Sequence, residues 1–138
     1  MRAAFEELAS LGTVAARSPV VASEPLGPSR RSFANAAVLL DSDLTPETLL
    51  RALQQIEREF GRRRARRWGE RVLDLDIVLW SGGALETADL TIPHPEFRSR
   101  PFVLAPAAAI APDWRDPATG LSVRQLNARL TRPRALPR

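Results

Sequence analysis

The stretch that most constrains the fold runs from Arg67 to Trp80 and reads Arg-Trp-Gly-Glu-Arg-Val-Leu-Asp-Leu-Asp-Ile-Val-Leu-Trp. In its second half, apolar residues alternate with Asp74 and Asp76, which is the period of a strand with one buried face. The pattern predicts a strand over residues 72–80 that projects both carboxylates from one face. Same-face residues of a strand lie roughly 6.6 to 7 Å apart, a separation at which two carboxylates can share one hard cation or hold a pair between them.

Basic residues precede this acidic pair. Arg67 and Arg71 flank Trp68-Gly69, and cations for phosphate beside carboxylates for a metal indicate nucleotide chemistry. The run Arg62–Arg67 is expected to be a mobile loop unless an anion gathers it. RNA binding is the alternative interpretation, although the run has no interleaved aromatic residues. All 20 basic residues are Arg, and this compositional bias weakens any argument from Arg abundance alone.

Length and composition predict one domain over residues 1–130, followed by a disordered Arg/Pro tail over residues 131–138. No run of 18 apolar residues and no basic-then-apolar leader occurs, so neither a membrane span nor a secretory signal is expected, and the expected location is cytoplasmic. The absence of Cys excludes thiolate metal sites, and a single His leaves little room for zinc. The net charge of +4 favours anionic partners.

Periodicity and capping signals predict an alternation of helices and strands. Thr45-Pro46-Glu47 opens a helix that we expect to end at Gly61, and Ser122 with Gln125 forms a capping box for a last helix reaching about Leu130. The other expected elements are a helix over residues 1–11 ending at Gly12, a strand over residues 13–22 interrupted near Pro19, a strand over residues 32–40, an edge strand over residues 91–93 and a helix over residues 103–110.

Several residues outside the acidic stretch have both a functional and a structural interpretation. Phe33 and Asn35 share one face of the strand over residues 32–40, where the ring can also be core and the amide can satisfy backbone groups. Gln54 and Glu57 border the apolar stripe of their helix, near a site or on a solvated edge. A second polar cluster reads His94-Pro95-Glu96-Phe97-Arg98-Ser99-Arg100-Pro101-Phe102, although a lone His is more often structural.

The acidic stretch and several further blocks together resemble the bacterial hydroxymethyldihydropterin pyrophosphokinases of folate synthesis. The resemblance extends from residue 1 to about residue 130. The blocks occur in the order typical of that family: Pro25-Leu26-Gly27-Pro28, Phe33-Ala34-Asn35-Ala36-Ala37-Val38, Ile56-Glu57, Gly61-Arg62, Thr91-Ile92-Pro93-His94 and Arg100-Pro101-Phe102.

The resemblance implies an α+β fold, a ferredoxin-like sandwich of an antiparallel sheet with helices packed on it. It implies transfer of pyrophosphate from ATP to 6-hydroxymethyl-7,8-dihydropterin with release of AMP. Separately, we expect a monomer that binds neither nucleic acid nor membrane. Members of the family begin with a strand ending in a Gly-Ser-Asn turn, and this first strand is missing here. We expect either a true start upstream of Met1 or a degraded or swapped form.

The resemblance also assigns roles to individual residues, by similarity only. Asp74 and Asp76 hold two Mg²⁺ ions, and Arg62 and Arg71 are catalytic cations that close over the phosphates. The residues implied in ATP binding are Gln54, Arg67, Trp68, Arg71, Ile77, Thr91, His94 and Arg100. Those implied in pterin binding are Leu26, Phe33, Asn35 and Phe102.

Three features depart from the family pattern. Phe33 stands where Tyr is common, Pro95 stands where an aromatic residue is common, and the arginine loop is one residue shorter. Two alternatives to the enzyme stay open: a non-catalytic remnant that binds pterin or nucleotide, which the missing strand suggests, and an arginine-rich RNA-binding protein, which the arginine run suggests.

Overall fold

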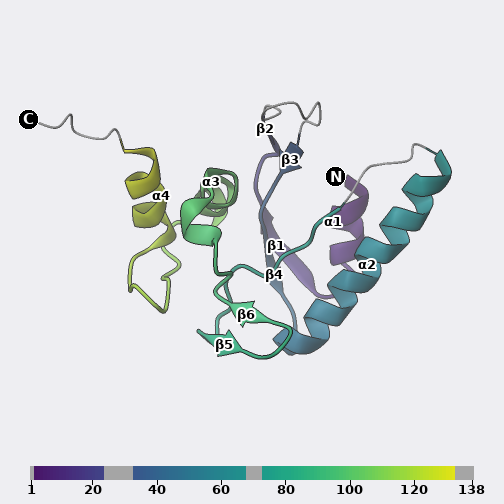
Figure 1. Cartoon of the computed structure of the whole chain (residues 1–138), viewed down its shortest axis with the longest axis horizontal. Coiled ribbons are helices and arrows are strands. Elements are labelled where there is room, and N and C mark those ends of the chain that lie inside the picture. Colours follow the sequence, from purple (N-terminus) through teal and green to yellow (C-terminus); the bar gives the residue numbers. More distant parts are fainter. Residues whose placement is uncertain (1, 24–32, 68–72, 133–138) are drawn as a thin grey trace, which may run out of the picture. The chain divides into compact units, whose positions relative to one another are not determined.

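The computed structural model describes residues 2–23, 33–67 and 73–132, which fall into two compact units. The first unit comprises Met1–Val14 and Leu40–His94, and the second comprises Ala15–Leu39 and Pro95–Arg138. Figure 1 shows the elements of both units, coloured along the sequence from the N-terminus to the C-terminus. Strands β1 and β4 contribute residues to both units. The expectation of a single domain over residues 1–130 stays a prediction.

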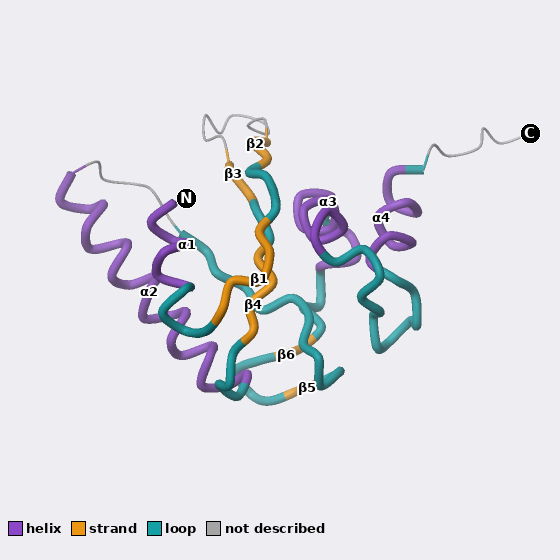
Figure 2. Tube along the Cα trace, turned by 180° about the vertical axis from the view of Figure 1, so that it is seen from behind, coloured by secondary structure: helices purple, strands orange, loops and turns teal. Residues whose placement is uncertain are grey.

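Two helices form the apolar part of the first unit. Helix α1 (Arg2–Leu8) packs against α2 (Pro46–Arg67), beside which it lies in Figures 1 and 2. The buried side chains are Ala4 and Leu8 of α1 with Leu53 and Ile56 of α2. The predicted cap of α2 is confirmed, since the Thr45 hydroxyl accepts a hydrogen bond from the Thr48 N–H at 3.3 Å.

The prediction that Gly61 ends this helix is wrong. Helix α2 continues to Arg67, so the backbone of the arginine run lies in a helix and not in a loop. A helix-ending glycine adopts positive φ, and the described glycines that do so are Gly83 and Gly120. Arg is a good helix former because its unbranched stem loses little freedom, and Arg62 pairs with Glu59 one turn earlier at 2.6 Å.

A short hairpin completes the first unit. Strand β5 (Leu85–Glu86) pairs antiparallel with β6 (Thr91–Ile92), which confirms the predicted edge strand. Ile92 is 1% exposed and anchors the hairpin. A turn precedes the hairpin, where Gly83 has a φ of +98° and bridges back to Trp80.

The strand predicted over residues 72–80 is not formed in the part of it that the structure describes. Leu73–Leu79 contains no strand residue, Trp80 makes only an isolated bridge, and Figure 2 colours this chain segment as loop where it is described. A strand requires a ladder of backbone hydrogen bonds to a neighbour. Between described residues this segment has only scattered bonds, such as that from the His94 N–H to the Val78 carbonyl at 3.0 Å.

Four strands lie between residues 13 and 41. Strand β1 (Thr13–Arg17) pairs with β4 (Val38–Asp41), and β2 (Val21–Ser23) pairs antiparallel with β3 (Phe33–Asn35). The predicted interruption of residues 13–22 near Pro19 is therefore confirmed.

The prediction of one continuous strand over residues 32–40 is wrong, because it splits into β3 and β4. Pro19 has no N–H to donate to a ladder, so the pairing is interrupted beside it. At the break, the buried Ser18 forms two hydrogen bonds with Ala37. The Ser18 N–H donates to the Ala37 carbonyl at 2.9 Å, and the Ser18 hydroxyl accepts from the Ala37 N–H at 2.8 Å. Ser18 thus provides hydrogen-bond partners for both the N–H and the carbonyl of Ala37, between β3 and β4.

The second unit is completed by a 3₁₀ turn η1 (Phe97–Ser99) and helices α3 (Pro101–Ile110) and α4 (Val123–Thr131). Helix α3 contacts α4, η1, β2 and β3, around a core of Phe97, Leu104 and Val123. The capping box is confirmed, with Ser122 and Gln125 exchanging bonds of 3.1 and 2.9 Å. Helices and small antiparallel sheets make this an α+β chain, as expected. Among the described helices, none has the length and apolarity needed to cross a membrane.

Candidate functional site

The acidic pair lies on a segment whose exposure alternates. Asp74 and Asp76 are exposed, whereas Leu73, Leu75 and Ile77 are half-buried. The predicted two-faced character of the segment is thus present although the ladder is not. Neither carboxylate forms a hydrogen bond or an ion pair with another described residue. Both are therefore available to a ligand.

The donor set of this pair suits a hard divalent cation. Mg²⁺ keeps several waters and takes only one or two protein carboxylates, often together with substrate phosphates. Within the described ranges no group of three or more His, Cys, Asp or Glu side chains is placed to hold a metal ion. Asp74 and Asp76 fit a magnesium ion shared with a phosphate better than a closed, all-protein metal cage.

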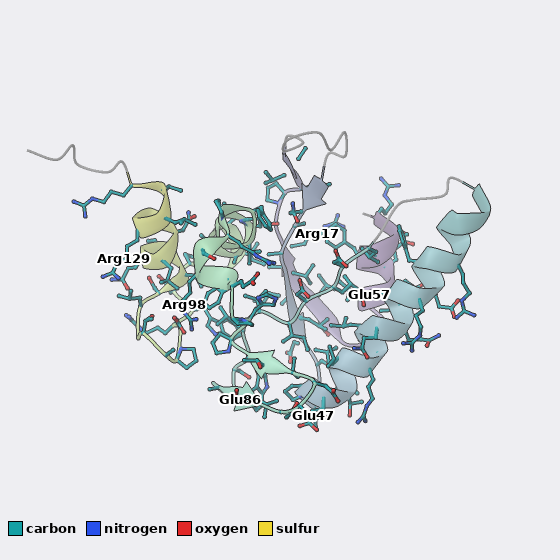
Figure 3. The ribbon with its side chains drawn as sticks, in the orientation of Figure 1. Arg17, Glu47, Glu57, Glu86, Arg98 and Arg129 are labelled. Carbon is teal, nitrogen blue, oxygen red and sulfur yellow. The ribbon has the colours of Figure 1, made fainter. Side chains whose placement is uncertain are left out.

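Two contacts hold the acidic segment to the rest of the first unit. The Leu75 N–H, between the two aspartates, donates to Oε2 of Glu57 on α2 at 2.7 Å. Farther along, the Val78 carbonyl accepts from the His94 N–H, just beyond β6. Glu57 is half-buried and is labelled in Figure 3. The sequence analysis placed Glu57 at the border of the apolar stripe, near a site or on a solvated edge, and assigned it no individual role. Its position three residues after Gln54 was the available signal.

The other described residues implied in nucleotide binding within this unit differ in exposure. Gln54 and Arg62 are exposed on α2, and Arg62 donates to Glu59 at 2.6 Å, so a phosphate would have to compete for that guanidinium. Thr91 is exposed in β6, while Ile77 and His94 are half-buried.

The second unit carries the described residues implied in pterin binding, together with Arg100. Asn35 ends β3, where it is half-buried and lies opposite Val21 of β2. Phe102, in the first turn of α3, is 41% exposed. The Arg100 guanidinium lies 5.8 Å from the centre of the Phe102 ring and pairs with Glu96. Because α3 contacts β3, the elements that carry Asn35 and Phe102 are neighbours.

Some implied residues cannot be followed in the structure. Leu26, Trp68 and Arg71 lie outside the described residues. Phe33 in β3 and Arg67 at the end of α2 are described in their backbone only.

A buried ion pair in the second unit was not predicted from the sequence. Asp116 is fully buried and accepts from Arg98 Nε at 2.5 Å and Nη2 at 2.7 Å. It also accepts from the Ala118 N–H at 3.0 Å and the Thr119 hydroxyl at 2.8 Å. The bond from Arg98 is the largest influence that lowers the pKa of Asp116 from 3.8 to about 2. Arg98 lies 18 residues before Asp116, so no local sequence pattern contains this pair.

The comparisons with known proteins agree with the earlier resemblance. The model of a family described as 7,8-dihydro-6-hydroxymethylpterin-pyrophosphokinase (HPPK) matches residues 1–112. A 2-amino-4-hydroxy-6-hydroxymethyldihydropteridine pyrophosphokinase of Synechocystis is 48% identical over 104 residues, which are 75% of this chain and 53% of that protein. Proteins of the same name from Pseudomonas aeruginosa and Bacillus subtilis are 48% identical over 115 residues and 40% identical over 119 residues.

The chain covers only part of these relatives. It spans about half the length of the Synechocystis protein, 70% of the Pseudomonas protein and 71% of the Bacillus protein. Of this chain itself, the last two alignments cover 83% and 86%.

Proposed function

Because this chain belongs to the 7,8-dihydro-6-hydroxymethylpterin-pyrophosphokinase family, we propose that it transfers pyrophosphate from ATP to the hydroxymethyl group of 6-hydroxymethyl-7,8-dihydropterin. The hydroxyl oxygen attacks the β-phosphorus, the bond from that phosphorus to the α–β bridging oxygen breaks, and AMP and a proton leave. The observation that carries the proposal is the exposed pair Asp74 and Asp76, whose carboxylates form no hydrogen bond or ion pair with another described residue.

In this proposal Asp74 and Asp76 would hold two Mg²⁺ ions. When bound, the metal neutralises negative charge on the transferred phosphates. Displacement at phosphorus depends mostly on positioning and on charge neutralisation, so it requires no covalent nucleophile from the protein. Exposed, unpaired carboxylates support this assignment, since a carboxylate held in an internal ion pair would first have to give up its partner.

Two cationic side chains would bind the phosphates, and a larger set of residues would contact the rest of the ATP. Arg62 and Arg71 act as catalytic cations. Arg62 forms a surface ion pair with Glu59, so its side chain is exposed and able to exchange partners. The remaining proposed ATP contacts are Gln54, Arg67, Trp68, Ile77, Thr91, His94 and Arg100.

The pterin ring is proposed to bind between Phe33 and Phe102. Asn35 and the backbone around Leu26 would recognise its hydrogen-bonding edge. The 41% exposure of Phe102 supports this role, because an exposed aromatic ring is available to a flat heterocycle. The contact of α3 with β3 supports the pairing of Phe102 with Asn35 in one site.

The finer description of the fold also belongs to this proposal. It is a ferredoxin-like sandwich with an antiparallel sheet, and the helices and small antiparallel sheets of this α+β chain support it. That a first strand is missing from this sheet stays a prediction.

The test is to incubate the 138-residue chain with ATP, Mg²⁺ and the pterin and to measure AMP and the pterin diphosphate. The proposal requires stoichiometric formation of both products and its loss on chelation of Mg²⁺. Nucleotide binding without AMP would instead support the non-catalytic remnant. Tight, salt-sensitive RNA binding that survives Asp74→Asn with Asp76→Asn would support the RNA-binding alternative.

A further inference from the structure

Glu57 makes a contact that the proposed reaction does not yet use. Its Oε2 accepts a hydrogen bond from the Leu75 N–H at 2.7 Å, and this bond joins α2 to a segment 18 residues farther along the chain. The distance is that of a well-formed hydrogen bond. Leu75 is the residue between the two proposed metal ligands.

The Leu75 N–H belongs to the peptide unit that joins Asp74 to Leu75. Because a peptide unit is planar, fixing the direction of its N–H fixes the orientation of the whole unit and therefore of the Asp74 backbone beside it. Among the described residues no strand ladder performs this task for the acidic segment. The contact from Glu57 takes the place of a ladder hydrogen bond at the position where two side chains need a defined direction.

A carboxylate at this position requires a specific explanation. Glu57 is half-buried, four residues after the buried Leu53 and next to the buried Ile56, where an apolar side chain would continue the stripe. Removing a carboxylate from water without a partner costs free energy, and the bond to Leu75 offsets that cost. The helix that presents Glu57 also presents Gln54 and Arg62, so one rigid element relates these residues to the acidic segment.

We propose that Glu57 is a positioning residue for the metal-binding pair, acting through its hydrogen bond to the Leu75 backbone and not through contact with metal or substrate. The inference rests on the proposed function, because it takes Asp74 and Asp76 as metal ligands. It predicts that the hydrogen-bond acceptor at position 57 matters more than its negative charge.

The test compares Glu57→Ala with Glu57→Gln, since the amide oxygen of Gln can still accept from the Leu75 N–H. Mn²⁺ binding in the presence of α,β-methylene-ATP, measured by electron paramagnetic resonance, is the main measurement. Loss of a group that orients a metal ligand weakens metal binding about 10- to 100-fold. We expect this loss in Glu57→Ala, and affinity closer to that of the parent chain in Glu57→Gln.

Amide hydrogen exchange at Leu75 is the second measurement. Exchange should accelerate in Glu57→Ala and stay slow in Glu57→Gln. The melting temperatures should show that both variants are folded at the temperature of the measurement. Glu47→Ala and Glu47→Gln are matched controls, because Glu47 is exposed in the first turn of the same helix, ten residues earlier.

The outcomes separate this inference from the proposed function. Equal losses in Glu57→Ala and Glu57→Gln would overturn it in favour of a role for the charge itself, and no loss in either would overturn it outright. If the parent chain makes no AMP but binds Mn²⁺, the proposed function fails while the comparison of variants still decides the role of Glu57. If the parent chain binds no Mn²⁺, the metal assignment and this inference both fail.

Discussion

Asp116 in the second unit and the pair Asp74 and Asp76 in the first unit differ in what their carboxylates contact. Asp116 is fully buried and receives hydrogen bonds from a guanidinium, a backbone N–H and a hydroxyl. Asp74 and Asp76 are exposed and receive none from described residues. Both regions also contain arginines, so residue type alone does not distinguish them.

The difference indicates which carboxylates serve the fold and which can serve a ligand. Protein donors already occupy the acceptor sites of Asp116, and breaking these bonds would leave a buried charge without a partner. The acceptor sites of Asp74 and Asp76 can be filled by a metal ion and its waters at no cost in internal bonds. Substitution should therefore affect stability in the second unit and activity in the first.

The largest expected effect is on activity. Asp74→Asn with Asp76→Asn should lower AMP formation by about a thousandfold or more, because metal ions contribute several kcal/mol of charge stabilisation in such reactions. The melting temperature should hardly change, since both side chains are exposed and unpaired. A large drop in melting temperature would break the comparison, because these residues would then be needed for folding.

The next effect is on stability. Asp116→Asn should lower the free energy of unfolding by about 3 kcal/mol, because it leaves Arg98 without its anionic partner in a largely buried position. Urea denaturation followed by circular dichroism measures this loss. Mn²⁺ binding by the folded fraction should be retained. A variant that unfolds like the parent chain would contradict the structural role of the pair.

The Asp116 carboxylate should also make the stability of the chain depend on pH. The pKa of Asp116 in the folded chain is lowered from 3.8 to about 2, so its contribution is fully present above pH 4 and is lost as the pH falls toward 2. The shift corresponds to about 2 kcal/mol. Denaturation curves between pH 6 and pH 2.5 should record this loss in the parent chain. Asp116→Asn should have a correspondingly flatter profile, and equal slopes would argue against the assignment.

The smallest expected effect concerns the helix that supports the acidic segment. Gly61→Ala should stabilise the chain by about 0.5 to 1 kcal/mol, because a Cβ at this helical position meets no atom within 4 Å and Ala restricts the unfolded chain. Thermal unfolding measures the gain, and Mn²⁺ binding should be unchanged. Destabilisation would mean that α2 ends at Gly61 in solution, as the sequence had suggested.

Local signals predicted most of the elements because the residues that carry them act on their own neighbours. The caps at Thr45 and Ser122 satisfy helix N–H groups within three residues, and Pro19 interrupts its own strand. Gly61 misled because glycine permits a helix end without requiring one. The split of the predicted strand over residues 32–40 was not visible in the sequence, because it involves a hydrogen bond between Ser18 and Ala37, which are 19 positions apart.

In the candidate site, too, local patterns predicted some features, whereas others depend on contacts between distant residues. Alternation alone predicted that Asp74 and Asp76 would project from one face, and their exposure agrees. The ladder expected around them depends on a partner segment, which periodicity does not specify. The bonds from Leu75 to Glu57 and from Arg98 to Asp116 each join residues 18 positions apart, so no local pattern contains them. Family resemblance supplied the ligand roles, which stay proposals.

The most direct measurement is the binding of Mn²⁺ in the presence of α,β-methylene-ATP, a nucleotide that resists cleavage at the bond the proposed reaction breaks. The parent chain should bind Mn²⁺ beyond the amount held by the nucleotide alone. Asp74→Asn with Asp76→Asn should remove this excess while the chain stays folded. Undiminished Mn²⁺ binding by the doubly substituted chain would contradict the claim that these two unpaired carboxylates are the metal ligands.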